Sequence, residues 1–262
     1  MLGLIHAELF RLGKSLTLKI MLMVTAVYSL IYGFSFLNYL YLKIGTIEET
    51  NFVPLSGFEA FASIDIDGMF AFFVPFLVVF FFTSEFSKKT FGNLIGAEIS
   101  KSKLFIAKYI SFGISILTIV FFSAVFITSA VTVVNGWGAN FDFRQVSEIF
   151  GLCIRIILMQ ISTASLCVVL SLFIHNDAII VILYFASSLV ESIITSLISR
   201  IEIKSGVSEF LVSSLPSNCT DTFQSLSVTS TELWNGSFCV CISIILCLTL
   251  GVAFIRKIDI NY

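Results

Sequence analysis

The residues able to do chemistry are few, and the most suggestive group imitates a phosphate-binding loop. Gly13, Lys14 and Ser15 match the last three positions of a P-loop, which needs another glycine five residues before Gly13. Glu8 stands at that position, and its carboxylate would repel a phosphate. No strand precedes the group. We therefore predict that this chain does not bind nucleotide.

The histidines and cysteines also lack the spacing of a catalytic or metal site. His6 and His175 have no HExxH or carboxylate-rich motif beside them, and His175-Asn176-Asp177 has the composition of a turn. Cys219 is expected in a loop, and no CxxC pair is present. The other five cysteines fall in apolar runs and are expected in the core: Cys153, Cys167, Cys239, Cys241 and Cys247. We predict no catalytic residue, no metal site and no cofactor on this chain.

Two ionisable residues lie inside long apolar runs. Arg155 and Glu191 are each about seven residues from one end of their predicted helix, so antiparallel neighbours would place them at similar depth. An unpaired charge in hydrocarbon is expensive. The two side chains are therefore expected either to pair with each other or to face a water-filled cavity that a substrate uses.

The composition indicates that lipid surrounds most of this chain. Hydrophobic residues make up 57% of the 262 residues, charged residues only 12%, and 29 residues are phenylalanine. Apolar runs without strict alternation exclude a membrane β-barrel and predict an all-α membrane protein. One transmembrane domain of six helices is expected over 1–262, with spans at about 16–42, 64–84, 104–134, 148–174, 178–199 and 237–255.

The distribution of charge predicts the orientation. With cytoplasmic termini, ten of the fifteen Lys and Arg residues are on the inner side: Arg11, Lys14, Lys19, Lys88, Lys89, Lys101, Lys103, Lys108, Arg256 and Lys257. Twelve of the seventeen acidic residues fall in or near outer segments. The sequence therefore favours a multi-pass protein of the cell membrane with both termini inside. The acidic outer face is explained either by ordinary solvated loops or by attraction of cationic cargo.

The first fifteen residues are predicted to form an amphipathic elbow helix. Leu2, Ile5, Leu9, Leu12 and Leu16 form an apolar stripe with helical spacing. The polar elbow residues fall off that stripe: Glu8, Arg11 and Lys14. Such a helix is expected to lie along the inner leaflet and to engage a partner. The simpler alternative is a lead-in to the first membrane span.

The segment between the second and third predicted spans is the most informative part of the chain. It is basic, bears phenylalanines and is expected to form a short amphipathic helix over 85–98. Such a helix could dock into a groove of a soluble protein, whereas the alternative is a loop made basic only by its inner location. The candidate docking residues are Glu85, Phe86, Lys88, Lys89, Phe91, Leu94 and Ile95.

The long segment at 200–236 is expected outside, before the last span. It contains Pro216 and several serines, and Trp234 fits an interfacial anchor. We expect short, half-inserted helices here. Whether they gate a pathway or only link two spans is left open by the sequence.

Taken together, the chain resembles the membrane subunit of ABC-2 type (type V) ABC transporters. It is most similar to the small permeases of peptide-export, bacitracin-resistance and lantibiotic-immunity systems. The landmarks are the amphipathic start, the segment TFGNLIGAEISKSKLFIAK, the proline in SSLPS and the ending FIRKIDI. Lys89 replaces a glycine of the family pattern, whereas the positions that fit it are Thr90, Gly96, Ser100 with Lys101, and Lys108.

The resemblance implies a function and partners. Two permeases, identical or similar, would form a dimer that binds two copies of a separate ATPase, which holds ATP and Mg²⁺. The elbow helix and the coupling helix at 85–98 would sit in the ATPase, and the pathway would lie between the first, second and fifth spans of the two permeases. The chain would be a non-catalytic subunit, bacterial in origin, that exports amphipathic peptides or similar hydrophobic compounds.

Two other classes of membrane protein fit the sequence less well. An intramembrane lipid-modifying enzyme would normally show clustered carboxylates or histidines, which the sequence lacks. A secondary transporter would normally show inverted repeats or a pair of broken helices, and Pro75 is the only proline in a predicted span. A nucleic-acid partner is not expected. The identity of the cargo and the direction of transport are left open.

Overall fold

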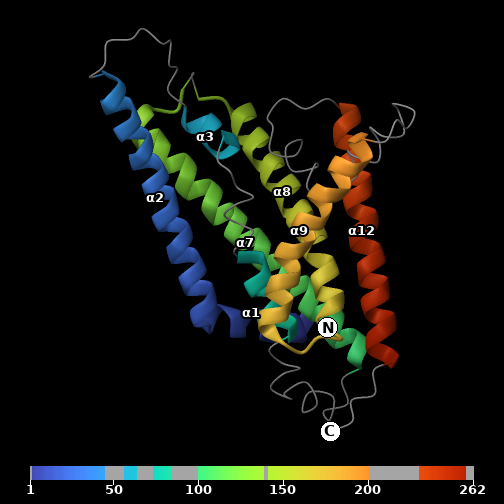
Figure 1. Ribbon diagram of the computed structural model, residues 1–262. Helices are drawn as coiled ribbons and strands as arrows, with labels where there is room; N and C mark the ends of the chain where they lie inside the picture. Colours follow the sequence, from blue (N-terminus) through green and yellow to red (C-terminus); the bar gives the residue numbers. More distant parts are fainter. Residues whose placement is uncertain are drawn as a thin grey trace.

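The computed structural model describes residues 2–44, 56–63, 73–83, 100–138, 141–200 and 230–257. Every regular element within these ranges is a helix, which confirms the all-α prediction for this part of the chain. The helices form an elongated bundle (Figure 1). Their bounds are α1 (Leu2–Lys14), α2 (Leu16–Ile44), α3 (Gly57–Ser63), the helix Phe73–Thr83 whose last turn is the π-helical η1 (Val79–Thr83), α7 (Lys101–Asn135), α8 (Phe143–Leu170), α9 (Asp177–Arg200) and α12 (Ser230–Lys257).

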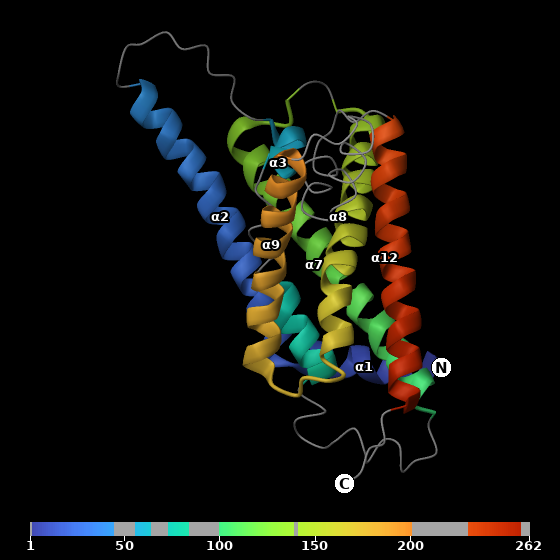
Figure 2. The same cartoon turned by 45° about the vertical axis from the view of Figure 1, so that its right-hand side comes forward.

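The long helices run between two ends of the bundle, which we name by the short helix each one carries. The α1 end holds α1, the start of α7, the α8–α9 turn and the end of α12 (Figures 1 and 2). The α3 end holds α3, the α7–α8 connection and the start of α12. The segments predicted to lie inside, where described, are thus at the α1 end, and those predicted outside are at the α3 end.

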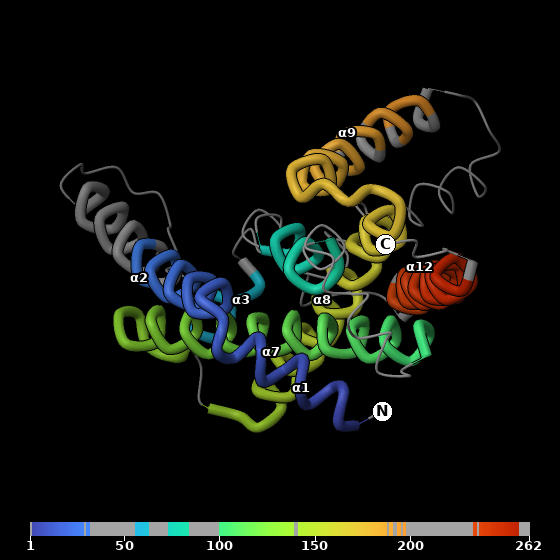
Figure 3. The backbone as a smooth tube through the Cα atoms, turned by 90° about the horizontal axis from the view of Figure 1, so that it is seen from below, coloured from blue at the N-terminus to red at the C-terminus, as the bar shows by residue number. Residues whose placement is uncertain are grey.

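Helix α7 is the central element of the bundle. It packs against α1, α2, α3, η1, α8 and α12, and seen from the α1 end it lies between α2 and α12 (Figure 3). The hydroxyl of Ser100 accepts a hydrogen bond from the Lys103 amide and caps its start. Gly136, with φ of 80°, ends the helix in a conformation that other residues rarely adopt.

The α3 end is held together by close backbone contacts. The amide of Gly57 donates to the carbonyl of Gly136 at 3.0 Å. A Cβ at Gly57 would collide with Thr132, so only glycine lets α3 approach α7 this closely. Helix α8 then starts with a capping box formed by Asp142 and Gln145.

The core at the α1 end is aromatic. Phe82 packs against Phe105 and Phe112 with ring centroids 5.8 and 6.1 Å apart, and Phe81 meets the Phe112 ring edge-on at 6.3 Å. Tyr109 shares a 2.7 Å hydrogen bond with Ser165, which joins α7 to α8. The phenylalanines of η1 and α7 thus fill the space between these helices.

Within the part of the chain that the structure describes, three helices are long and apolar enough to cross a membrane. They are Lys101–Asn135, Phe143–Leu170 and Gly236–Arg256, and shorter apolar helices occur at Leu16–Tyr28, Phe73–Thr83 and Asp177–Ser187. Large apolar side chains are exposed along α2, α9 and α12. Such faces are typical of helices whose solvent is lipid rather than water.

The helix bounds correct several predicted boundaries. Helix α8 begins at Phe143 instead of 148, because Asp142 caps it, and it ends at Leu170 instead of 174. Helix α12 begins at Ser230, so Trp234 lies within its first two turns instead of in a segment before it. Residues 201–229 of the predicted outer segment at 200–236 are outside the described residues, and these include Cys219.

Candidate functional site

Helix α1 crosses the end of the bundle and packs against α7 (Figures 2 and 3). Its buried face contains Leu12 and, unexpectedly for a charged residue, Glu8, which is only 7% exposed. His6, Phe10 and Lys14 are exposed, and the Lys14 ammonium lies 4.7 Å from the centroid of the Phe10 ring. The helix therefore presents one mixed apolar and basic face to its surroundings and fixes the other to the bundle.

A buried ion pair fixes α1 to α7. The Nζ atom of Lys108, a residue 2% exposed, donates a hydrogen bond of 2.8 Å to Oε1 of Glu8. The two residues are a hundred positions apart in the chain. Both side chains are almost completely removed from water, and their attraction offsets part of the cost of burying the two charges.

Arg11 extends this pair to the π-helical turn. Its Nη2 atom lies 2.8 Å from Oε2 of Glu8, one helical turn away. Its guanidinium also stands over the ring of Phe80, 4.9 Å from the centroid, which is a cation–π geometry. Glu8 thus links α1 to α7 directly and, through Arg11, to η1. We name Glu8, Arg11, Phe80 and Lys108 the elbow cluster.

The elbow cluster departs from the predicted arrangement of α1. The apolar stripe placed Glu8 off the buried face together with Arg11 and Lys14, and only Lys14 of these three is exposed. Glu8 is buried because Lys108 reaches it from α7, a contact that the periodicity of α1 alone does not contain. The signal available in the sequence was Lys108 itself, a cation at the entrance of an apolar run that needs a partner.

The predicted coupling residues at 85–98 fall outside the described residues. This applies to Glu85, Phe86, Lys88, Lys89, Phe91, Leu94 and Ile95. The flanking elements are described: η1 ends at Thr83 and α7 is capped by Ser100. Both flanking elements are at the α1 end. Each contains a residue of the elbow cluster, Phe80 on η1 and Lys108 on α7.

The predicted pairing of Arg155 with Glu191 stays a prediction. Arg155 is half-buried on α8, twelve residues after Phe143 rather than about seven from the helix start. Glu191 lies on α9, but its side chain is outside the part of the structure that is described. Helices α8 and α9 do pack against each other, as the prediction requires.

The turn between α8 and α9 has the structure predicted for it. The Oδ1 atom of Asn176 accepts hydrogen bonds from the amides of Ala178 and Ile179 at 3.0 and 3.3 Å and caps α9. The His175 ring nitrogen Nε2 lies 3.2 Å from the carbonyl oxygen of Leu172. The residues thus form a structural turn at the α1 end.

The cysteines that the structure describes are free thiols. Cys153 and Cys167 are buried in the core, as predicted, whereas Cys241 is exposed on α12 and Cys239 and Cys247 are half-buried. Their places on α8 and α12 follow from the apolar runs. Their exposure on α12 follows from that helix's location at the edge of the bundle (Figure 3).

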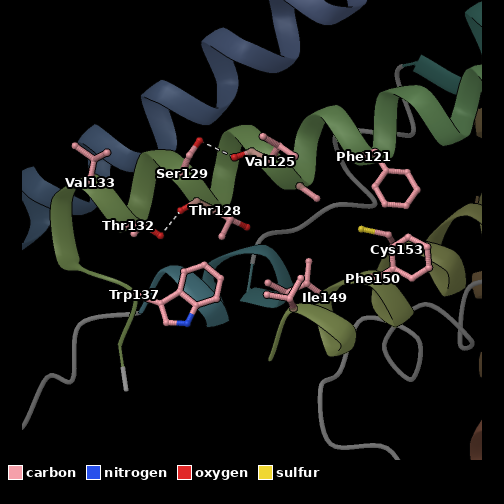
Figure 4. A pocket seen from close by; sticks show the side chains of 12 residues that line it. Phe121, Val125, Thr128, Ser129, Thr132, Val133, Trp137, Ile149, Phe150 and Cys153 are labelled. Atoms are coloured by element: carbon pink, nitrogen blue, oxygen red, sulfur yellow. Dashed lines mark hydrogen bonds between the residues drawn. The ribbon is translucent and has the colours of Figure 1, made fainter. Parts of the chain in front are cut away.

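At the α3 end, an apolar pocket of about 500 Å³ lies between α7 and α8 (Figure 4). Trp137 closes it at one edge, and its indole Nε1 donates a 2.7 Å hydrogen bond to Oε1 of Gln145. Sequence reasoning did not find this pocket, because it depends on how the two helices diverge. The described site residues therefore fall into a charged cluster at one end and an apolar cavity at the other.

A scan against models of known protein families gave no match, and neither did a search of curated proteins.

Proposed function

We propose that this chain is the membrane subunit of an ATP-binding cassette exporter whose ATPase is a separate chain. The observation that carries the proposal is the buried Glu8–Lys108 pair at 2.8 Å, which fastens an amphipathic helix crosswise to the base of α7. If α1 were only a lead-in to the first span, it would not need an ion pair with a helix a hundred residues later. If α1 receives force from a partner, it needs such a contact to pass the force on to α7.

The geometry supports a route for that force. Residues 84–99 join η1 to α7, and the elbow cluster connects α1 to both of these elements. An ATPase that engages α1 and the segment 84–99 would therefore pull on one connected unit. Movement of this unit would tilt α7, which contacts α2, α3, α8 and α12, and so would reach the α3 end.

In this proposal six helices cross the membrane. The three long apolar helices supply half of them, and α2, α9 and the helix including Phe73–Thr83 supply the others. The α1 end is cytoplasmic, in agreement with the excess of Lys and Arg in the segments that meet there. The chain acts as a dimer with an identical or similar permease, and ATP and Mg²⁺ bind only to the partner ATPase.

The proposed cargo is an amphipathic peptide or a similar hydrophobic compound that is moved out of the cell or membrane. Two features favour it: the resemblance of the sequence to small peptide-export permeases, and the acidic residues in the segments assigned to the outside. Transport measured in vesicles with candidate peptides and ATP would test both cargo and direction. Transport that proceeds without ATPase or ATP would instead indicate a secondary transporter.

The association with an ATPase is tested by co-purification from membranes of the source cell. Replacing Phe91 and Leu94 by Asp is expected to abolish recovery of a chain that carries GxxxxGK[ST], while the membrane part stays folded. Phe143→Asp is the matched control, because Phe143 is 82% exposed at the opposite end of the bundle. Equal recovery of the ATPase with both variants would count strongly against the proposal.

A further inference from the structure

The apolar pocket at the α3 end has the size of a ligand site. Its volume of about 500 Å³ falls within the roughly 300–1,000 Å³ of small-molecule pockets. One wall is α7, from Phe121 to Val133, and the other is α8, from Val146 to Cys153 (Figure 4). Cys153 is at its inner limit and Trp137 at its outer edge.

The lining offers almost no polar recognition. Three hydroxyl side chains occur in it, and two of them donate to carbonyls of their own helix: Ser129 to Val125 and Thr132 to Thr128, each at 2.6 Å. The indole N–H of Trp137 is already bonded to Gln145. Only the hydroxyl of Thr128 has no hydrogen-bond partner among the described residues. A polar or charged ligand would therefore exchange its hydration for very few hydrogen bonds, whereas a hydrocarbon has no polar hydration to lose.

The pocket opens on the side of the bundle. Val125 and Val133, at 64% and 86% exposure, form its rim on α7, and Phe150 is exposed on the α8 side. Both walls belong to helices long and apolar enough to span a membrane. Trp137 lies just beyond the end of α7, where a tryptophan is expected at the membrane interface. The opening therefore faces the acyl chains of the membrane, and its Trp137 edge lies at the interface between lipid and water.

We propose that this pocket binds one acyl chain of a membrane phospholipid, with the chain between α7 and α8 and the headgroup near the Trp137 edge. The proposal requires only that α7 and α8 cross a membrane, and it is independent of any ATPase. An apolar occupant would keep the two helices apart at this end, where their side chains do not fill the space between them.

The fluorescence of Trp137 can report an acyl chain in the pocket, because a brominated chain quenches tryptophan fluorescence only at close contact. The chain has two tryptophans, and Trp234 is 75% exposed on α12, so Trp234→Phe leaves Trp137 as the single fluorophore. This variant is reconstituted in phosphatidylcholine vesicles containing an increasing share of phosphatidylcholine brominated in its chains. Bound lipid predicts quenching that saturates at a low brominated share and that is reversed by excess unbrominated lipid.

Variants at Thr128 separate the pocket from general contact with lipid. Thr128→Phe fills the cavity and is expected to abolish the saturable quenching. Thr128→Val keeps the volume and removes the hydroxyl, for which no hydrogen-bond partner is seen among the described residues, and it is expected to retain the quenching. Ser129→Phe, at an exposed position on the rim, provides a second blocked variant that does not disturb the core.

Three outcomes would overturn the proposal. Quenching that rises in proportion to the brominated share and is the same in all variants would show surrounding lipid only. Saturable quenching that survives both phenylalanine variants would place the bound lipid elsewhere. Loss of the saturable quenching in Thr128→Val would show that the occupant needs a hydrogen bond and is not a hydrocarbon chain.

Discussion

The two ends of α7 differ in how they contact the neighbouring helices. At the α1 end a lysine enters the apolar bundle and is compensated by Glu8 of a helix that lies across it. At the α3 end the hydroxyls of Ser129 and Thr132 are satisfied within α7, and the space beside the helix is an apolar pocket. The first end is tied to a neighbour by directional contacts, and the second is separated from its neighbour by a cavity. A single rigid helix thus joins a fixed end to an end that has room to rearrange.

Breaking the ion pair should have the largest effect on stability. Glu8→Ala removes the carboxylate that lies against the buried Lys108 ammonium, and loss of one member of a buried pair costs about 3–5 kcal/mol. We expect a clear fall in the melting temperature of the purified protein in detergent. The double variant Glu8→Leu with Lys108→Met removes both charges and should recover most of the loss. If Glu8→Ala alone melts like the parent protein, the pair does not hold α1 in place.

The close approach of α3 to α7 should be the next most sensitive contact. Gly57→Ala forces a methyl group against Thr132, and overpacking of this kind costs about 1–3 kcal/mol. Gly13→Ala on α1 is the matched control, since a Cβ there meets nothing within 4 Å. We expect the first substitution to lower the melting temperature and the second to leave it unchanged or raise it. The reverse order would show that α3 does not pack on α7 as described.

The sequence predicted the elements much better than the contacts between them. Apolar runs located the long helices within a few residues, because twenty apolar residues in succession favour one structure in lipid. Glu8 was placed off the buried face and the pocket was missed for the same reason: each depends on how one helix lies against another, which the periodicity of a single helix does not contain. Lys108 decides the side of α1 that is buried, and the divergence of α7 from α8 creates the cavity.

The smallest expected effect concerns the start of α8. Asp142→Ala removes one partner of the capping box, which is worth about 1 kcal/mol, and loosens the turn that carries Trp137. We expect a small drop in melting temperature and a shift of Trp137 emission, measured with Trp234→Phe as background. Asp177→Ala serves as a control, because Asn176 rather than Asp177 caps α9. An emission spectrum that stays unchanged would mean that the capping box does not position Trp137.

In the proposed function, the α1 end of the bundle, and not the α3 end, engages a separate ATPase. A photo-crosslinking phenylalanine analogue at Phe10, 58% exposed on α1, is compared in the source cell with the same analogue at Phe143, 82% exposed at the other end. We expect the analogue at Phe10 to crosslink to a chain carrying GxxxxGK[ST], identified by mass spectrometry, and the analogue at Phe143 not to do so. Crosslinking of the ATPase from Phe143, or from neither position, would contradict this expectation.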